Sequence, residues 1–400
     1  MDSLNKILIT HTGSLPRPEA LTKLYTQMVA GEPINKEILN QHIAAATRSV
    51  IKQQRDSGID IPNNGEQCRE AFFLYIQRRM KGFGGRGSRK PWGDLLDYPE
   101  FAEFSQANFA AKTMVSNRNP PVALKEVKYI APEQNLAEIH NFKTILSEEW
   151  PNCSSAFITA PSPGMLAAAM HNRYYPNDEE YLNALGKAVS IEYHAAVNNG
   201  LILQIDAPDL AMERHLTFAD KPVDNFLQFA EDVVVQINKA IIGIPADKIR
   251  LHVCWGNYEG PHHLDVPLKE ILPILLKAKV GGLMLPFANP RHQHEMAVLR
   301  DIPLGTNQYL IAGVVDPLTN FIEHPEVIAQ RIESATKAIG DPRKVQAGTD
   351  CGFDTAAGMG RVTSDIAWAK LKVMREGAQL AASRLFPFRL LSYCFVSNQK

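Results

Sequence analysis

The chain is 400 residues long, and 45% of its residues are hydrophobic while 21% are charged. This balance allows a large buried core, and no continuous apolar run reaches the roughly 18 residues that a membrane helix needs. The 42 Lys and Arg residues nearly cancel the 43 Asp and Glu residues. A nucleic acid or an anionic membrane is therefore not an expected partner. We expect a small, largely neutral ligand instead.

The N-terminal sequence MDSLNKILITHTGSLPRP contains a four-residue apolar run, which is too short for the core of a secretory signal. We therefore expect a cytoplasmic protein. The five cysteines are scattered along the chain, at positions 68, 153, 254, 351 and 394. This pattern does not indicate a set of disulfides, so in a reducing compartment the thiols remain free for chemistry.

Short apolar runs that end in Gly, Pro, Asn or Asp recur along the chain, each followed by a longer amphipathic stretch. Eight such runs occur, over residues 7–16, 58–67, 155–164, 201–210, 250–257, 281–290, 309–318 and 344–353. Helical patterns such as DEEYLNALGKAVSIEYHAAVNNG lie between them. Strand and helix alternating eight times predict an α/β fold, a single (β/α)8 TIM barrel over residues 1–400.

Residues 83–150 interrupt this rhythm and are predicted to be an insertion after the second strand. They contain one further strand-like run, PVALKEVKYIAP. Counting that run would give the barrel nine strands, so we expect it to lie at the periphery. Either this insertion or an N-terminal region that covers the bottom of the barrel is a candidate contact surface for a homo-oligomer.

The residues that close the eight runs are expected to gather at one rim of the barrel, where the carboxyl ends of the strands meet and barrel enzymes place their chemistry. They include Ser14, Glu66, Asp206, His252, Cys254, Asn289, Asp316, Asp350 and Cys351.

Three of these residues have side chains that bind soft metals. His252 and Cys254 lie two residues apart in RLHVCWGNYEG, and side chains alternate along a strand, so both point to the same face. Cys351, in GTDCG, reaches the same rim from the eighth run. Zinc prefers such ligands. A His-x-Cys pair alone is a weak motif, however, and ordinary packing on a buried strand is the alternative.

Six motifs together carry a family resemblance. THTGSLPRP, NNGEQ, LQIDAPDLA, HVCWGN, NPRHQHE and GTDCGF, in this order, resemble the C-terminal catalytic half of cobalamin-independent methionine synthase. They look closer still to the single-domain branch of that superfamily, which includes epoxyalkane:coenzyme M transferase. The similarity extends over nearly the whole chain and is more specific to the superfamily than to one reaction.

The resemblance implies a Zn2+-dependent transfer of a methyl or other alkyl group to a thiol such as homocysteine, a step of methionine biosynthesis. His252, Cys254 and Cys351 stand at the family's zinc-ligand positions. A thiol that binds Zn2+ has a lowered pKa and reacts as a thiolate at neutral pH. The family's glutamate ligand is replaced by Pro286, so we expect water or the substrate to complete the site, ahead of Glu259, His292 or His294.

The resemblance also suggests roles for other rim residues. Ser14, Glu66 and Asp206 match positions that hold the amino and carboxylate groups of homocysteine, although a turn or helix-cap role is the alternative for Ser14 and Asp206. Glu66, Asp206 and Asp316 are the candidates for orienting groups or moving protons.

The loops that follow two of the strands hold further candidates. Asn289 and Arg291 are candidates for binding an anionic group on the substrate. The adjacent His262 and His263 diverge, so no second metal is expected from this pair, but either residue could border the active site.

Two departures weaken the case for methyltetrahydrofolate as the alkyl donor. The synthases carry a proton-donating His shortly after the Asp of their seventh strand, whereas here Asp316 is followed by Pro317 and Leu318. The segment TAPSPGMLAAAMHN also differs from their folate-contacting stretch. Attack of the zinc thiolate on an epoxide, as in a coenzyme M transferase or lyase, is therefore the alternative activity. A binding or regulatory barrel with a structural zinc is a third reading, disfavoured because structural sites usually close with four ligands.

Overall fold

The computed structural model describes residues 5–386, and Cys394 lies outside this range. Its strands are β1 (Met80–Gly84), β2 (Val122–Tyr129), β3 (Phe157–Pro161), β4 (Ile202–Asp206), β5 (Ile249–His252), β6 (Gly282–Pro286), β7 (Tyr309–Val315) and β8 (Val345–Thr349). Its α-helices are α1 (Glu19–Ala30), α2 (Lys36–Asp56), α3 (Pro99–Ala110), α4 (Pro132–Glu149), α5 (Pro163–Ala169), α6 (Asp178–Asn198), α7 (Val223–Ala240), α8 (Leu268–Leu275), α9 (Val298–Asp301), α10 (Pro325–Ile339) and α11 (Ser364–Leu385). Short 3-10 helices connect them: η2 (Leu74–Arg78), η3 (Gly93–Asp97), η4 (Pro208–Leu210), η5 (Met212–His215), η6 (Ala246–Lys248), η7 (Gln293–Ala297) and η8 (Pro342–Lys344).

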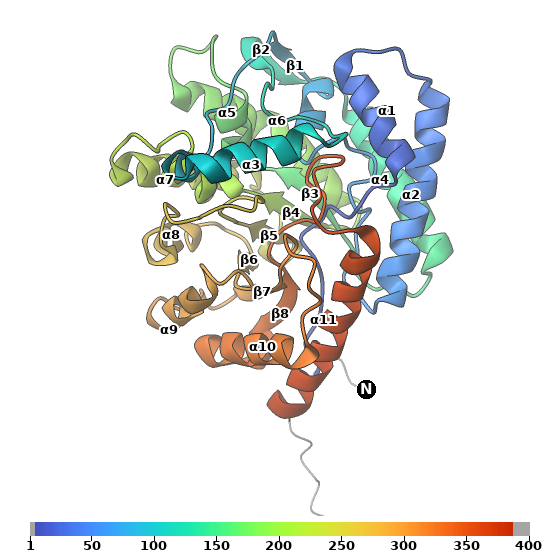
Figure 1. The fold of residues 1–400 in the computed structure, drawn as a ribbon, viewed down its shortest axis with the longest axis vertical. Helices are drawn as coiled ribbons and strands as arrows, with labels where there is room; N and C mark the ends of the chain where they lie inside the picture. Colours follow the sequence, from blue (N-terminus) through green and yellow to red (C-terminus); the bar gives the residue numbers. More distant parts are fainter. Residues whose placement is uncertain (1–4, 387–400) are drawn as a thin grey trace, which may run out of the picture.

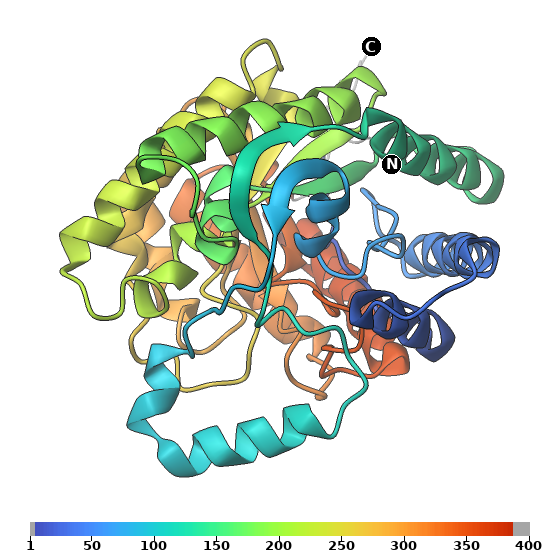
Figure 2. The ribbon, with the colours of Figure 1, turned by 90° about the horizontal axis from the view of Figure 1, so that it is seen from above.

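Strands β3 to β8 form one parallel sheet in which the order along the sheet follows the order along the chain (Figure 1). Helices lie between successive strands and surround the sheet (Figure 2). The strands are almost entirely buried, as expected for apolar runs covered on both faces. The predicted alternation of parallel strands and helices is therefore confirmed over this part of the chain.

The capping and patterning of α10 illustrate why these segments are helical. The His324 side chain accepts a hydrogen bond from the backbone N–H of Glu326 at the start, and Gly340, with φ 84°, ends the helix. Ile328 and Ile332, four residues apart, face the core. Gln330, between them, is exposed.

The first two predicted strands, within residues 7–16 and 58–67, are not regular strands, and this part of the prediction is wrong. Residues 7–16 contribute only an isolated bridge between Ile9 and Ala347, and residues 58–67 contribute none. The reason is that side chains take hydrogen bonds that a strand ladder would use. The Gln54 side chain binds both the N–H and the C=O of Asn63, and Thr349 Oγ1 accepts from the N–H of Thr12.

These two segments nevertheless run between the two edge strands of the sheet, β8 and β3. Thr10 N donates to Ala347 O at 2.9 Å on the β8 side, and Phe157 N of β3 donates to Pro62 O at 2.9 Å. Asp60 N donates to Ile9 O at 2.9 Å, which joins the two segments to each other. A chain of backbone hydrogen bonds therefore leads from β8 to β3 through residues 8–62.

The extra strand-like run corresponds to β2, which pairs antiparallel with β1 in a separate two-stranded sheet. It therefore lies outside the six-stranded sheet, as predicted. Helix α3 lies at the outside of the molecule (Figure 2), whereas α4 packs between α2 and α6. Within residues 5–386, no helix combines the length and apolar character that crossing a bilayer requires.

Candidate metal centre

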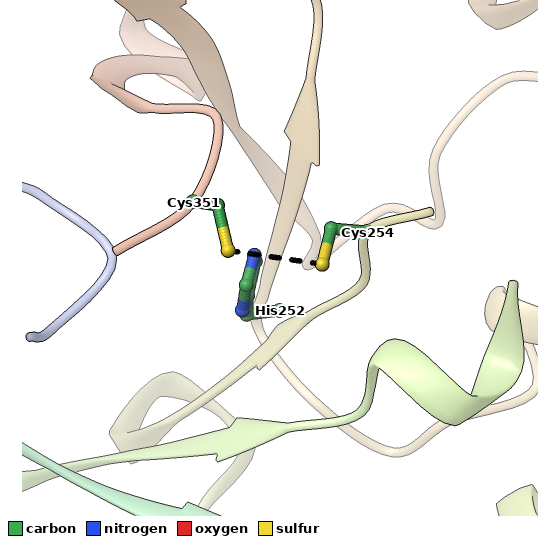
Figure 3. Close-up of side chains that lie close together, drawn as sticks. All are labelled: His252, Cys254 and Cys351. Carbon is green, nitrogen blue, oxygen red and sulfur yellow. Dashed lines mark hydrogen bonds between the residues drawn. The ribbon is translucent and has the colours of Figure 1, made fainter. Parts of the chain in front are cut away.

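His252, Cys254 and Cys351 converge at the carboxyl end of the sheet. His252 is the last residue of β5, Cys254 follows it, and Cys351 lies just beyond β8. A ring nitrogen and the two Sγ atoms all lie within 4.8 Å of one another, and the Sγ atoms are 3.9 Å apart (Figure 3). All three side chains are buried. The predicted convergence of these residues is confirmed.

The orientation of the His252 ring follows from the register of β4 and β5, in which Asp206 is opposite His252. Asp206 Oδ1 lies 3.1 Å from His252 Nδ1 and also accepts a hydrogen bond from Gln204 Nε2 at 2.7 Å. With the Nδ1 proton donated to Asp206, the Nε2 lone pair is available to a metal. Such carboxylate–histidine pairs are the usual outer support of metal ligands.

The two thiols form a coupled pair. A hydrogen bond with Cys351 and the nearby His252 ring hold the pKa of Cys254 well below the usual value of a thiol. The same contact raises the pKa of Cys351. One thiolate next to one thiol, with a ring nitrogen beside them, is a donor set that suits Zn2+, and a bound cation favours both thiolates.

The cluster opens on a pocket that leaves room for a fourth ligand. The pocket wall contains Cys254, Trp255, Gly256, Asn257, His262, Pro286, Asn289, His292, Asp316, Pro317, Leu318, Asp350 and Cys351. Pro286 contributes no donor atom there. None of the three side chains considered as a substitute belongs to the cluster: Glu259 pairs with Arg361, His292 contacts two carboxylates, and His294 lies in a different cavity.

Glu66 is buried beside Asp206 in a strained backbone conformation, with φ 55°. Its Oε1 accepts a hydrogen bond from Thr159 Oγ1 at 2.9 Å, but Oε2 has no partner among the described residues. Burial and the neighbouring Asp206 raise the pKa of Glu66 to about 7. Gly13 allows this approach, because a Cβ there would lie 2.9 Å from Glu66 Oε1. Two neighbouring carboxyl groups with an unused acceptor suit a cationic ligand group.

Ser14 lies against the segment that carries Cys351. Its Oγ would be 2.0 Å from a Cβ atom at Gly352, and its carbonyl accepts a hydrogen bond from Phe353 N. It does not cap α1, whose N-cap is Pro18. Ser14 is therefore positioned next to the metal-ligand cluster.

The carboxylates of Asp316 and Asp350 both accept hydrogen bonds from backbone N–H groups. Asp316 accepts hydrogen bonds from Leu318 N and Thr319 Oγ1, which closes the turn after β7. Asp350 accepts from three successive backbone N–H groups, those of residues 287–289. Burial raises the pKa of Asp350 to about 7. Asp350 therefore anchors the segment after β6 next to Cys351.

The two candidates for anion binding are placed differently. Asn289 lies in the pocket wall, where its Oδ1 accepts from the backbone N–H of Arg291. Arg291 is exposed, is absent from the pocket wall, and donates through Nε to the carbonyl of His262 at 3.2 Å. The structure therefore brings Asn289, but not Arg291, to the pocket.

Sequence reasoning missed three residues that support the pocket wall: His215, Asp265 and Glu295. Asp265 contacts His262, and Glu295 contacts His292, each at a spacing of three residues. The motifs HHLD and HQHE contain this spacing and are the signal that could have indicated the pairs. His215 carries no comparable signal, because it follows β4 in a short helical turn.

No protein-family model matches the chain. The chain is similar to a methionine synthase of Saccharolobus islandicus, with 26% identity over 389 residues, covering 96% of this chain and 98% of the relative. It is also similar to a methionine synthase of Pyrococcus furiosus, with 28% identity over 342 residues, covering 85% and 84% of the two chains.

Two solved structures share the fold. A B12-independent methionine synthase from Shewanella sp. W3-18-1, in complex with selenomethionine, superposes with a TM-score of 0.69 at 18% identity, over 96% of this chain and all of that one. A putative vitamin-B12-independent methionine synthase from Listeria monocytogenes gives a TM-score of 0.60 at 19% identity, over 94% and 99% of the two chains.

Proposed function

We propose that this protein transfers a methyl or related alkyl group to a thiol substrate such as homocysteine, with Zn2+ as cofactor. The observation that carries the proposal is the convergence of His252, Cys254 and Cys351 at a pocket. The similarity to methionine synthases over nearly the full length supports the same reaction class. The partners are then a small-molecule thiol and an alkyl donor, in the cytoplasm.

His252 Nε2 and the sulfur atoms of Cys254 and Cys351 would hold the zinc ion. When bound, Zn2+ lowers the pKa of a substrate thiol so that a thiolate attacks the alkyl donor. Asp206 keeps the His252 ring in the tautomer that this requires. With three protein ligands, the fourth position is available to the substrate sulfur.

Glu66 and Asp206 provide the negative charge that would hold the ammonium group of an amino thiol. Glu66 Oε2, buried without a partner, is a ready acceptor for it. Ser14, beside Cys351, would bind the carboxylate of the same substrate, and Asn289 would bind a polar group from the pocket wall. Arg291 would have to move from its exposed position to reach an anionic substrate.

Asp316 is proposed to orient the pocket residues Pro317 and Leu318 through its turn. Both of its carboxylate oxygens accept hydrogen bonds within that turn, so a proton-transfer role would require the turn to open. The apolar pair occupies the place where the methionine synthases carry their proton donor. This observation favours a second candidate, in which the zinc thiolate attacks an epoxide or related electrophile.

The proposed architecture is a closed (β/α)8 barrel formed as one domain over residues 1–400. The segments 8–12 and 58–62, which carry the backbone hydrogen bonds between β8 and β3, would complete it. Residues 83–150 would be the insertion, with η3, α3 and β2 as its distinct elements and a surface for a homo-oligomer.

Metal analysis and turnover assays test the proposal. Zinc-loaded protein is assayed for thiol-dependent consumption of methyltetrahydrofolate, of methylcobalamin as a generic methyl donor, and of a simple epoxide, with Cys351→Ala as control. We expect one donor class to be consumed and the control to be inactive. Zinc-loaded wild-type protein that consumes none of them would contradict the enzymatic proposal.

A further inference from the structure

A second group of metal-binding side chains lies behind the pocket wall, where three histidines surround Asp265. Asp265 Oδ2 is 3.0 Å from His262 Nδ1 and 2.7 Å from His292 Nε2. Asp265 Oδ1 is 3.2 Å from His215 Nδ1. The four side chains are at most 6% exposed. One donor atom each of His262, Asp265 and His292 therefore lies within 4.8 Å of the other two, and His215 contacts the second carboxylate oxygen.

The other ring nitrogen of each histidine already has an acceptor. His292 Nδ1 lies 2.8 Å from Glu295 Oε2, and His262 Nε2 lies 3.1 Å from the carbonyl oxygen of Tyr258. Those nitrogens therefore carry the protons. A neutral ring then presents a lone pair to the Asp265 carboxylate, whereas a doubly protonated ring donates a hydrogen bond to it.

His215 follows the same rule. Its Nε2 lies 3.5 Å from the hydroxyl oxygen of Tyr258, whose own proton is donated to Asp94, so the hydroxyl accepts from His215. His215 Nδ1 and Asp265 Oδ1 face each other, yet neither has a hydrogen-bond partner among the described residues. The buried Asp265 carboxylate and the ring nitrogens around it need a cation, which is either a proton on a ring or a metal ion.

The backbone at His262 is strained in a way that serves this arrangement. His262 has φ 54°, which side chains other than glycine rarely adopt, and its N–H donates to Asp94 Oδ2 at 2.9 Å. Residues held in such conformations concentrate at functional sites. The strain thus supports a ligand role for the His262 ring.

We infer that His262 Nδ1, His292 Nε2 and Asp265 Oδ2 form a second metal site for a divalent transition metal such as Zn2+, with His215 supporting the Asp265 carboxylate through Oδ1. Zinc bonds of 2.0–2.2 Å in a tetrahedron place the ligand atoms roughly 3.3 Å apart, close to the separations from Asp265 given above. Histidine tautomers fixed by a carboxylate or carbonyl are the usual support of such ligands. The sequence predicts no metal at the adjacent His262 and His263, whereas the inferred site takes only His262 of that pair and adds ligands from further along the chain.

The site joins the loops that form the pocket. His215 follows β4, His262 and Asp265 follow β5, and His292 follows β6. The His292 ring stacks on Trp255 with centroids 4.0 Å apart, and His262 and His292 also belong to the pocket wall. A metal held by His262, Asp265 and His292 would tie the loops after β5 and β6 together.

Cobalt titration of the full-length wild-type protein, after removal of all metal, tests the inference without a mutation. We expect two equivalents of Co2+ to bind. One should show thiolate-to-metal charge-transfer absorption, and the other only ligand-field bands of a nitrogen and oxygen site. A single equivalent with sulfur ligation would overturn the second site, because protons would then occupy it.

Variants separate the two sites. Asp265→Asn is expected to weaken the second class of Co2+ binding at least about 100-fold and to keep the sulfur absorption. Cys351→Ala should lose the sulfur absorption and keep the second class of Co2+ binding. His294→Ala, which changes an exposed neighbour in η7, should retain both classes. If Asp265→Asn binds two equivalents with wild-type affinity, the assignment is wrong. If the proposed function is wrong, only the class of Co2+ binding with sulfur ligands is affected. The class of Co2+ binding at Asp265 is still tested by the same titration.

Discussion

The two clusters at the pocket differ in donor chemistry and in closure. His252, Cys254 and Cys351 offer two sulfur atoms and one nitrogen at strand ends, with one side open to the pocket. The cluster around Asp265 offers nitrogen and oxygen from loops, with each histidine fixed by an outer acceptor. A site that is open to a pocket suits catalysis, whereas a site enclosed by supporting side chains suits a structural role. If both proposals hold, a reactive centre and a supporting one share one pocket wall.

Both regions also contain strained backbone. The described residues include two non-glycine residues with positive φ, Glu66 and His262, and each lies in one of these regions. In the first region the strained residue carries an unused carboxylate oxygen beside Asp206. In the second it positions a ring that already has its supporting contacts.

Loss of a sulfur ligand should give the largest effect. Cys351→Ala is expected to lower kcat/KM about 1000-fold, because the substrate thiol loses about 4 kcal/mol of activation by the metal. The protein should lose one metal equivalent and keep the other. Steady-state kinetics together with elemental analysis check this, and activity above a tenth of the wild type would break the assignment of the reactive centre.

Loss of the central carboxylate of the second cluster should affect stability more than chemistry. Asp265→Asn is expected to lower the free energy of unfolding by about 3 kcal/mol, since the buried cation that this carboxylate binds loses its charged partner. The activity of the folded protein should fall less than tenfold. Denaturant unfolding with and without a chelator measures the change, and His294→Ala serves as the matched control. Equal free energies of unfolding for Asp265→Asn and His294→Ala would contradict a structural role of the second cluster.

An intermediate effect is expected at the carboxylate behind His252. Asp206→Asn should weaken zinc binding at the sulfur site 10- to 100-fold, because His252 loses the acceptor that fixes its tautomer. Competition with a chromophoric chelator measures the affinity. The second cluster should bind its metal as tightly as before, and a parallel loss at both sites would mean that the variant acts through the fold.

The smallest effect concerns substrate affinity and its dependence on pH. Glu66→Gln is expected to raise KM for an amino thiol about tenfold, as for a lost charge-assisted hydrogen bond. Since burial raises the pKa of Glu66 to about 7, the wild-type KM should fall as the pH rises through 7, when the carboxylate forms. The variant should lack this dependence. A KM profile between pH 6 and 8, roughly one unit on either side of that pKa, tests it.

The raised pKa of Glu66 also determines how the free energy of unfolding changes with pH. The folded pKa of Glu66 lies above the ordinary 4.5, so the folded state binds the proton more tightly than the unfolded state. The resulting stabilisation is complete below pH 4.5 and is lost as the pH rises through 7. Glu66→Gln should therefore flatten the stability profile over that window, which thermal unfolding at a series of pH values can detect.

Sequence periodicity alone was enough to predict part of the candidate metal centre. The alternation of side chains along a strand placed His252 and Cys254 on one face, and the parallel sheet brought Cys351 to them. The same reasoning failed for residues 7–16 and 58–67, because Gln54, a helical residue, supplies hydrogen bonds that no pattern reveals. It also failed for His215, whose contact with Asp265 depends on how two loops pack.

The Asp350 carboxylate links the two clusters through a few residues. It precedes Cys351 and holds the backbone N–H groups of residues 287–289, three residues before His292. Occupancy of one metal site can therefore affect the other only through this short connection. Since each variant above is expected to change one site and to leave the affinity of the other unchanged, the coupling free energy between the two sites should be close to zero.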